Sequence, residues 1–189
     1  MPTSFQQTDT NLNGTIGSNV FCSGRTNNGS YARECTIGGT AGTTSNLDSL
    51  GSAVTLVVME RFKLVVPDGI SWLAGTWTWR YEVSGANMNI SLEEVHICRV
   101  NSSNVNQQTI GSATGLGVGF GATGVLSGNI TGVASTPAVG DYVAIVLVFT
   151  NGAMSFQSWS FKPSQIITSP YDTPTRTPRP ISIGHPFIF

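Results

Sequence analysis

Residues 76–83 read TWTWRYEV, and this stretch decides the fold class. Apolar side chains alternate with polar ones along it, Trp77, Trp79, Tyr81 and Val83 against Thr76, Thr78, Arg80 and Glu82. A period of two indicates a β-strand with one buried face and one solvated face. We therefore predict that the aromatic rings belong to a core. The alternative is an exposed aromatic platform on which a sugar or a base stacks.

The stretches around this strand carry further strand and turn signals. Residues 142–149, YVAIVLVF, are continuously apolar, which indicates a central strand covered on both faces. Residues 88–100 change phase at Glu93 and Glu94, and a β-bulge there would keep both halves on the buried face. Residues 137–141, PAVGD, predict a turn, and Asn151-Gly152 predicts a hairpin.

These signals together predict an all-β fold. They amount to about eight strands at short spacing, separated by Gly, Asn and Asp turns, with no helical period of useful length. The chain of 189 residues fits one domain on length. We expect an antiparallel β-sandwich of the jelly-roll type, and an immunoglobulin-like sandwich is the alternative.

Composition divides the chain into three parts. Residues 1–51 are polar and rich in Gly, Asn, Ser and Thr, and are expected to form an extended arm with one or two short strands, at residues 17–22 and 33–37, with a disordered leader as the alternative. Residues 52–162 form the sandwich body. Residues 163–189 are proline-rich and predict a second extended arm, with a linker as the alternative. Large apolar residues scattered along the arms are the expected anchors on other proteins: Phe5, Leu12, Ile16, Tyr171, Ile181, Phe187, Ile188 and Phe189.

Charge and hydropathy exclude several classes of partner. The formal net charge is −1, so no basic surface predicts nucleic-acid binding. No apolar run is long enough for a transmembrane helix, so we expect no membrane partner. Residues 1–10 have no signal-peptide pattern, and we expect the chain to be made and folded in a cytoplasm. The three cysteines are then expected to be free thiols, and a Cys22–Cys35 bridge in an oxidising compartment is the alternative.

No set of residues predicts catalysis or a cofactor. Glu94, His96 and Cys98 share one strand face, but no second ligand pair predicts a metal site, and a partly buried histidine is the expected role. Glu93 and Glu94 do not form the separated carboxylate pair of a glycosidase, and no Gly-x-Ser-x-Gly elbow opens a helix. Residues 115–119, GLGVG, predict a closely packed strand rather than a phosphate loop. We predict a protein that is not an enzyme and has no metal or cofactor.

Several stretches resemble small virion proteins of tailed bacteriophages. They are WTWR at 77–80, ANMN at 86–89, VHICRV at 95–100, residues 140–151, FKPSQ at 161–165 and TSP at 168–170, and the resemblance covers residues 72–170. It implies a capsid or tail component with a β-sandwich body. The capsid decoration, or cement, proteins of this group cross-link subunits of the major capsid protein and often form dimers or trimers. The expected partners are therefore the major capsid protein and further copies of this chain, on the capsid surface. The alternative is a tail or fibre module that recognises a host-surface carbohydrate.

Overall fold

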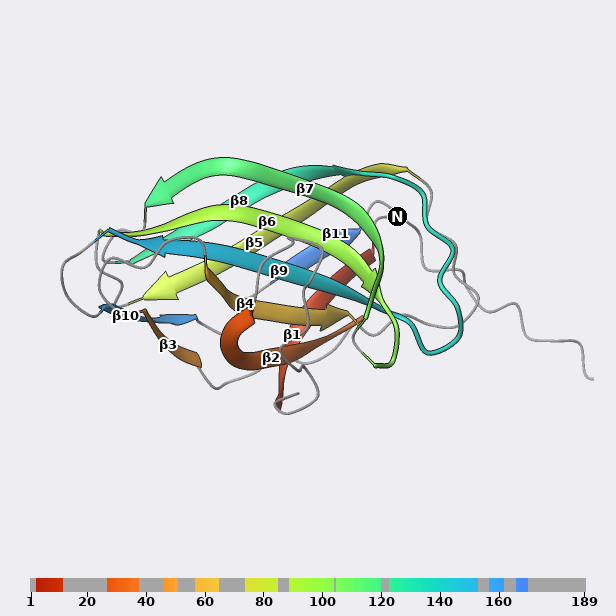
Figure 1. Ribbon diagram of the computed structural model, residues 1–189, viewed down its shortest axis with the longest axis horizontal. Helices are drawn as coiled ribbons and strands as arrows, with labels where there is room; N and C mark the ends of the chain where they lie inside the picture. Colours follow the sequence, from red (N-terminus) through yellow and green to blue (C-terminus); the bar gives the residue numbers. More distant parts are fainter. Residues whose placement is uncertain are drawn as a thin grey trace, which may run out of the picture.

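The computed structural model is an all-β chain whose strands form two stacked layers (Figure 1). It describes residues 3–11, 27–37, 46–50, 57–64, 74–84, 89–103, 105–119, 123–152, 157–161 and 166–169, with side chains chiefly between residues 74 and 152. These residues form β1 (Thr3–Asn11), β2 (Asn27–Ile37), β3 (Asn46–Leu50), β4 (Val57–Leu64), β5 (Gly75–Ser84), β6 (Ile90–Val100), β7 (Asn106–Gly119), β8 (Thr123–Gly132), β9 (Tyr142–Asn151), β10 (Gln157–Phe161) and β11 (Ile166–Ser169). The predicted jelly-roll-like sandwich is confirmed.

One continuous ladder of hydrogen bonds links the two layers. Its order is β3-β10-β5-β11-β1-β2-β4-β9-β6-β7, and β8 pairs with the other side of β5. The neighbours are antiparallel except for β2 and β4, which are parallel. The described part of the chain contains no helix long and apolar enough to span a membrane.

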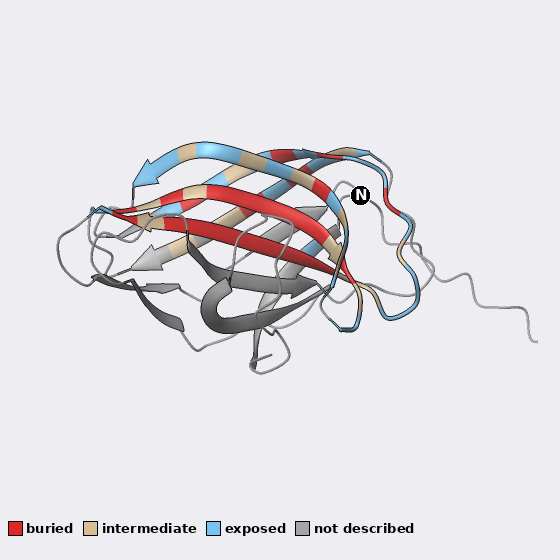
Figure 2. Ribbon diagram, viewed as in Figure 1, coloured by how far each residue is buried: buried red, intermediate tan, exposed pale blue. Residues whose placement is uncertain are grey.

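The centre of the front layer is the pair β6–β9, which is buried on both faces (Figure 2). One face carries a cluster of Cys98, Val100, Ala144, Val146 and Val148, against which Tyr142 packs. The other face carries Val95, Ile97, Ile145 and Leu147, each at most 1% exposed. Because β9 lies between β4 and β6, its edges are also covered. The continuously apolar stretch at residues 142–149 is therefore the central strand that its sequence predicts.

The phase change in β6 is a bulge, as predicted. The registers of β6 with β7 and with β9 both shift between Leu92 and Glu94. The extra residue, Glu93, accepts a hydrogen bond from the Thr150 hydroxyl of β9 (3.1 Å). The bulge places Ile90 and Leu92 on the same buried face as Val95. A strict two-residue alternation would put Val95 on the opposite face.

The two tryptophans of β5 are core residues that lie over glycines of β8. A Cβ on Gly128 would come within 2.6 Å of the Trp79 ring, and one on Gly132 would come within 2.9 Å of the Trp77 ring. Glycine at these two positions leaves room for the rings, so both rings pack directly on the β8 backbone. Trp77 and Trp79 are 0% and 4% exposed, which confirms the predicted core role.

Two predictions about this body are wrong. Asn151-Gly152 ends β9 but does not start a hairpin, because both edges of β9 already pair with β4 and β6 while β10 pairs with β3 and β5. Close packing on this glycine-rich stretch occurs at Gly111, where a Cβ would lie 2.7 Å from Ile130 Cγ2, but not at Gly115 or Gly117, where it would meet nothing within 4 Å. Their φ values of 66° and 56° are instead the reason, because L side chains rarely adopt them.

Strands also form inside the segments predicted as arms. β1, β2 and β3 lie within residues 1–51, and β11 lies within residues 163–189. β1 is hydrogen-bonded to β2 and to β11, so these strands belong to the ladder. They bring the described strands above the predicted number, because polar Thr-, Ser- and Asn-rich stretches carry little strand signal. The division at residues 51 and 162 stays a prediction.

Candidate interaction surface

The Glu94, His96 and Cys98 line is a buried structural feature of β6. His96 Nε2 lies 2.8 Å from Glu94 Oε2, and the two side chains are 8% and 10% exposed, respectively. Cys98 is disulfide-bonded, so the expectation of free thiols is wrong for this residue. Three cysteines without a framework spacing carry no signal for this bond.

Neither a metal-ligand group nor a serine–histidine hydrogen bond is described around His96. No group of three or more His, Cys, Asp or Glu side chains there could hold a metal ion. Ser112 of β7 is the ladder partner of His96, but no described hydrogen bond joins the two side chains. A Ser–His–acid triad needs that hydrogen bond or a close approach to it.

The predicted arm anchors fall mostly beyond the described residues. Phe5 lies in β1, where its backbone pairs with Ile167 of β11 and Ile37 of β2. The other seven lie outside the described residues: Leu12, Ile16, Tyr171, Ile181, Phe187, Ile188 and Phe189. Their role as interface anchors stays a prediction.

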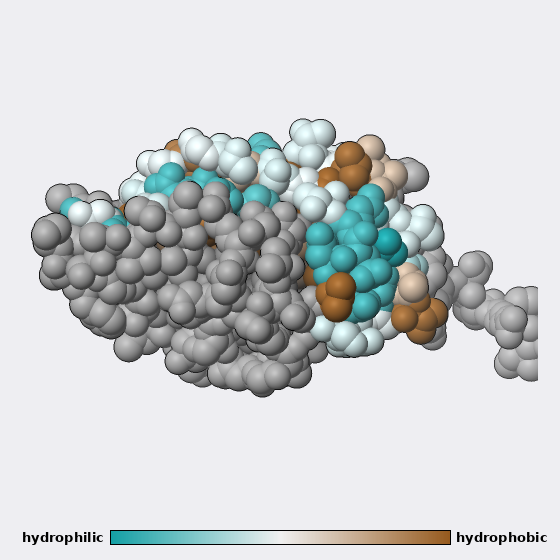
Figure 3. All heavy atoms as spheres, in the orientation of Figure 1, coloured by the Kyte–Doolittle hydropathy of each residue, from teal (hydrophilic) through white to brown (hydrophobic). Residues whose placement is uncertain are grey.

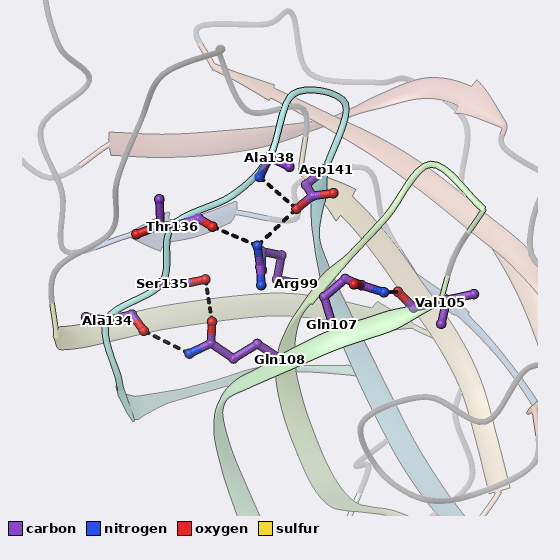
Figure 4. A network of polar contacts seen from close by, with 9 residues as sticks. All are labelled: Arg99, Val105, Gln107, Gln108, Ala134, Ser135, Thr136, Ala138 and Asp141. Carbon is purple, nitrogen blue, oxygen red and sulfur yellow. Dashed lines mark hydrogen bonds and ion pairs between the residues drawn. The ribbon is translucent and has the colours of Figure 1, made fainter.

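The structure instead draws attention to one end of the sandwich, where two loops are fixed by polar contacts. We call this the docking end and define it as residues 101–103 and 105, between β6 and β7, and residues 133–141, between β8 and β9. Figure 4 shows the contacts that hold the second loop. Arg99 Nη1 donates to the carbonyl of Thr136 (2.7 Å) and to Asp141 Oδ2 (3.2 Å). The guanidinium of Arg99 thus attaches the middle of the loop, at Thr136, and the end of the loop, at Asp141, to β6.

The tip of the second loop is a tight turn. The amide of Asp141 donates to the carbonyl of Ala138 (3.1 Å), and Asp141 Oδ2 accepts from the amide of Ala138 (2.9 Å). Gly140, the third residue of this turn, has a φ of 84°, as a type II turn requires. The turn predicted from PAVGD is confirmed, and it places Val139 at its tip with 82% of the residue exposed.

A second set of contacts attaches the same loop to β7. Gln108 Nε2 donates to the carbonyl of Ala134 (2.8 Å), and the Ser135 hydroxyl donates to Gln108 Oε1 (2.7 Å) (Figure 4). The amide of Val133 donates to the carbonyl of Ile110 (2.8 Å). The loop therefore rests on both β6 and β7, and its backbone is held at several points.

The first loop is organised by one asparagine. Asn101 Oδ1 accepts from the amides of Ser103 (3.0 Å) and Val105 (2.9 Å), and the Asn101 amide donates to the carbonyl of Val105 (3.1 Å). Such asparagine-capped turns fix a short loop without any apolar packing. Val105 is held in place with 48% of the residue exposed.

The docking end therefore combines fixed backbones with exposed apolar side chains. Val105, Val133 and Val139 are all about half exposed or more. The polar side chains of the two loops are Asn, Ser and Thr, apart from Asp141, whose carboxylate is mostly buried against Arg99. Figure 3 shows hydrophobic side chains next to a hydrophilic region at this end of the molecule. Sequence reasoning treated these residues only as turns. The signal that would have found them is the absence of any Asp, Glu, Lys, Arg or His from residues 100–140.

Comparison with known proteins bears on the fold alone. No protein-family model matches the sequence, and neither does any curated protein. A CocE/NonD family hydrolase from Staphylococcus aureus has a similar structure, with a TM-score of 0.51 at 9% identity over 89% of this chain. The chain spans only 36% of that hydrolase, so the likeness concerns one part of a larger protein.

Two further solved structures are more distant. A CBM4 structure has a TM-score of 0.37 at 12% identity, with 66% of this chain and 84% of that chain covered. A structure of infectious bursal disease virus has a TM-score of 0.36 at 13% identity, with 69% of this chain and 32% of that chain covered. A fold shared at such low sequence identity does not indicate a function.

Proposed function

We propose that this chain is a non-enzymatic structural protein of a virion, of the capsid decoration type. It binds subunits of the major capsid protein, cross-links them and stabilises the head. The observation that supports this most is the docking end, where two fixed loops hold Val105 and Val139 exposed and where the charged pair of Arg99 and Asp141 is mostly buried. The cores of protein interfaces are depleted of charge and rimmed by polar groups. Loops that are already ordered lose little entropy on docking.

The two ends of the chain are proposed to add contacts to the same lattice. Ordering an extended segment costs about 1–2 kcal/mol of backbone entropy per residue. Burying a phenylalanine such as Phe187 or Phe189 contributes about 1.5–3 kcal/mol, so closely spaced anchors such as these two can offset the ordering of a short stretch. In this proposal the protein is made in the host cytoplasm and acts on the capsid surface, with the major capsid protein and further copies of itself as partners.

The test compares particles with and without the protein. Purified protein is added to particles that lack it, and the bound copies per particle and the temperature at which the particles release their genome are measured. We expect binding in many copies on the head and a higher release temperature. Val139→Lys should bind in fewer copies, whereas Thr78→Lys, on the exposed face of β5, should bind like the wild type. Equal release temperatures, or full binding by Val139→Lys, would contradict the proposal.

The second candidate is a tail or fibre module that binds a host-surface carbohydrate. The exposed side chain of Gln107, beside the docking end in β7, favours it, because its amide oxygen could accept a hydrogen bond from a sugar hydroxyl. The buried rings of Trp77 and Trp79 disfavour it, because neither can stack on a sugar. Binding of the isolated protein to purified host glycans, with few copies located at the tail, would replace the decoration proposal with this one.

A further inference from the structure

The disulfide bond of Cys98 has two candidate partners. The chain contains three cysteines, Cys22, Cys35 and Cys98, and Cys98 is disulfide-bonded. Within one chain the bond therefore joins Cys98 to Cys22 or to Cys35, and the third cysteine keeps its thiol. The ladder of strands distinguishes the two pairings, because a disulfide joins Cα atoms that are about 4.4–6.8 Å apart.

Cys98 lies in the centre of the front layer and points away from β8. Its neighbour Ile97 pairs with Gly111 of β7, and a Cβ on Gly111 would lie 2.7 Å from Ile130 of β8. Successive side chains of a strand point to opposite faces, so Cys98 is on the face that is turned away from β8. Cys98 and Val146, on this outward face, are nevertheless both 0% exposed. Another segment of the chain therefore covers this face.

The backbone of Cys35 is fixed three strands away from that of Cys98. In the ladder, Cys98 pairs with Ala144 of β9, which pairs with Lys63 of β4. Lys63 in turn pairs with Glu34 of β2, the residue before Cys35. Neighbouring strands are about 4.8 Å apart, so three steps separate the two backbones by about 14 Å in a flat sheet. A Cys35–Cys98 bond would need about half of that distance or less, although β4 and β9 stand between the two strands.

The position of Cys22 in the sequence imposes no such separation. Cys22 lies outside the described residues, in the connection between Asn11, where β1 ends, and Asn27, where β2 begins. It precedes Asn27 by five residues, and five extended residues span up to about 17 Å. The connection is therefore long enough for Cys22 to cross from β2 to β6.

We propose that the disulfide bond joins Cys22 to Cys98 and that Cys35 keeps a free thiol. When the bond forms, each of the two thiols gives up one proton and one electron, and the two sulfur atoms become bonded. A small disulfide such as oxidised glutathione accepts both protons and both electrons, and its own S–S bond breaks to give two thiols. The bond attaches the connection between β1 and β2 to the front layer, and this attachment exists only under oxidising conditions. The inference goes beyond the proposed function, because it holds whether or not the chain is part of a virion.

Trypsin places the three cysteines in three different peptides, so the pairing is directly measurable. Cleavage after Lys and Arg puts Cys22 in peptide 1–25, Cys35 in peptide 34–61 and Cys98 in peptide 81–99. The full-length protein is incubated with oxidised glutathione, its remaining thiols are blocked with N-ethylmaleimide, and the unreduced digest is analysed by mass spectrometry. We expect peptide 1–25 to be linked to peptide 81–99. A link from peptide 34–61 to either of the other two, or no link between any of the three, overturns the proposal.

Cysteine variants give a second readout, the change of Tm when a reductant is added. The wild type and Cys35→Ser, the matched control that keeps the bond, should each lose about 5 °C or more. Cys22→Ser and Cys98→Ser lack the bond, so their Tm should not respond to the reductant. A Cys22→Ser protein that still responds, or a Cys35→Ser protein that does not, contradicts the pairing. The peptide map of the wild type needs no variant, so it decides the pairing even if Cys98→Ser does not fold.

Discussion

β9 and β8 both lack charged residues, but for different physical reasons. In β9, residues 143–149 are all buried, and both edges are hydrogen-bonded to β4 and β6. A charge there would be desolvated at a cost of several kcal/mol. Among the described strands β8 pairs with β5 alone, and every second residue from Val125 to Thr131 faces solvent, so a lysine or glutamate at Ser127 would cost the fold almost nothing.

The comparison separates two demands on a sequence. The missing charge in β9 is explained by folding, whereas the missing charge on the exposed face of β8 is not. The following predictions test this distinction, starting with the largest expected effect on stability.

Trp79→Ala should lower the free energy of unfolding by about 3–5 kcal/mol, because the ring fills the space over Gly128 and is 4% exposed. Urea denaturation followed by fluorescence or circular dichroism measures this. A variant of wild-type stability that no longer bound a sugar would give the ring a recognition role and would refute the core assignment.

The substitutions Val146→Ala and Val125→Ala remove the same atoms from β9 and from β8, so their effects can be compared directly. Val146 of β9 is 0% exposed and Val125 of β8 is 50% exposed. We expect Val146→Ala to cost about 1.5–3 kcal/mol of unfolding free energy and Val125→Ala less than about 0.5 kcal/mol. The urea concentrations at which the two variants are half unfolded measure both losses of stability. Equal losses would mean that β8 is as much a part of the core as β9.

Gly132→Ala should lower the free energy of unfolding by about 1–3 kcal/mol, since the new methyl group would lie 2.9 Å from the Trp77 ring and 3.0 Å from Ile110 Cγ2. Gly115→Ala is the contrasting change, because its Cβ meets nothing and only its positive φ makes it costly, by about 1 kcal/mol. Thermal unfolding of both variants measures the difference. A harmless Gly132→Ala would show that the ring does not rest on the β8 backbone.

Arg99→Met should lower the free energy of unfolding by about 1–2 kcal/mol, because two hydrogen bonds to the docking end are lost and Asp141 keeps only its own backbone contact. The effect should be local. Amide hydrogen exchange should accelerate at residues 134–141 and stay unchanged in the centre of β9. Acceleration across β9 as well would mean that Arg99 supports the whole sandwich rather than one loop.

The sequence predicted the parts of the fold that depend on short-range pattern. The alternation in β5, the apolar run of β9, the bulge at Glu93 and the turn at residues 137–141 each follow from neighbouring residues. The hairpin at Asn151-Gly152 failed because strand pairing is decided by which edges are free, and both edges of β9 were taken. The glycines at 115 and 117 were assigned to close packing because sequence cannot distinguish a need for space from a need for positive φ.

The candidate surface was harder to predict than the fold. Arg99, Gln108 and Asp141 are far apart in sequence, and only the packing of the β8–β9 loop on β6 and β7 brings them together. The disulfide bond of Cys98 also depends on a long-range approach that spacing does not encode. The uncharged run at residues 100–140 was visible from the start, but it acquires meaning only once burial shows that much of it is exposed.

Hydrogen exchange on assembled particles tests the central claim most directly. Amide exchange would be measured for the free protein and for the protein bound to purified virions, with β9 as an internal reference. We expect residues 101–105 and 133–141 to exchange more slowly on the particle, while residues 143–149 stay the same. Unchanged exchange of both loops in protein that is bound to particles would contradict the account, because the docking end would then face solvent in the assembly.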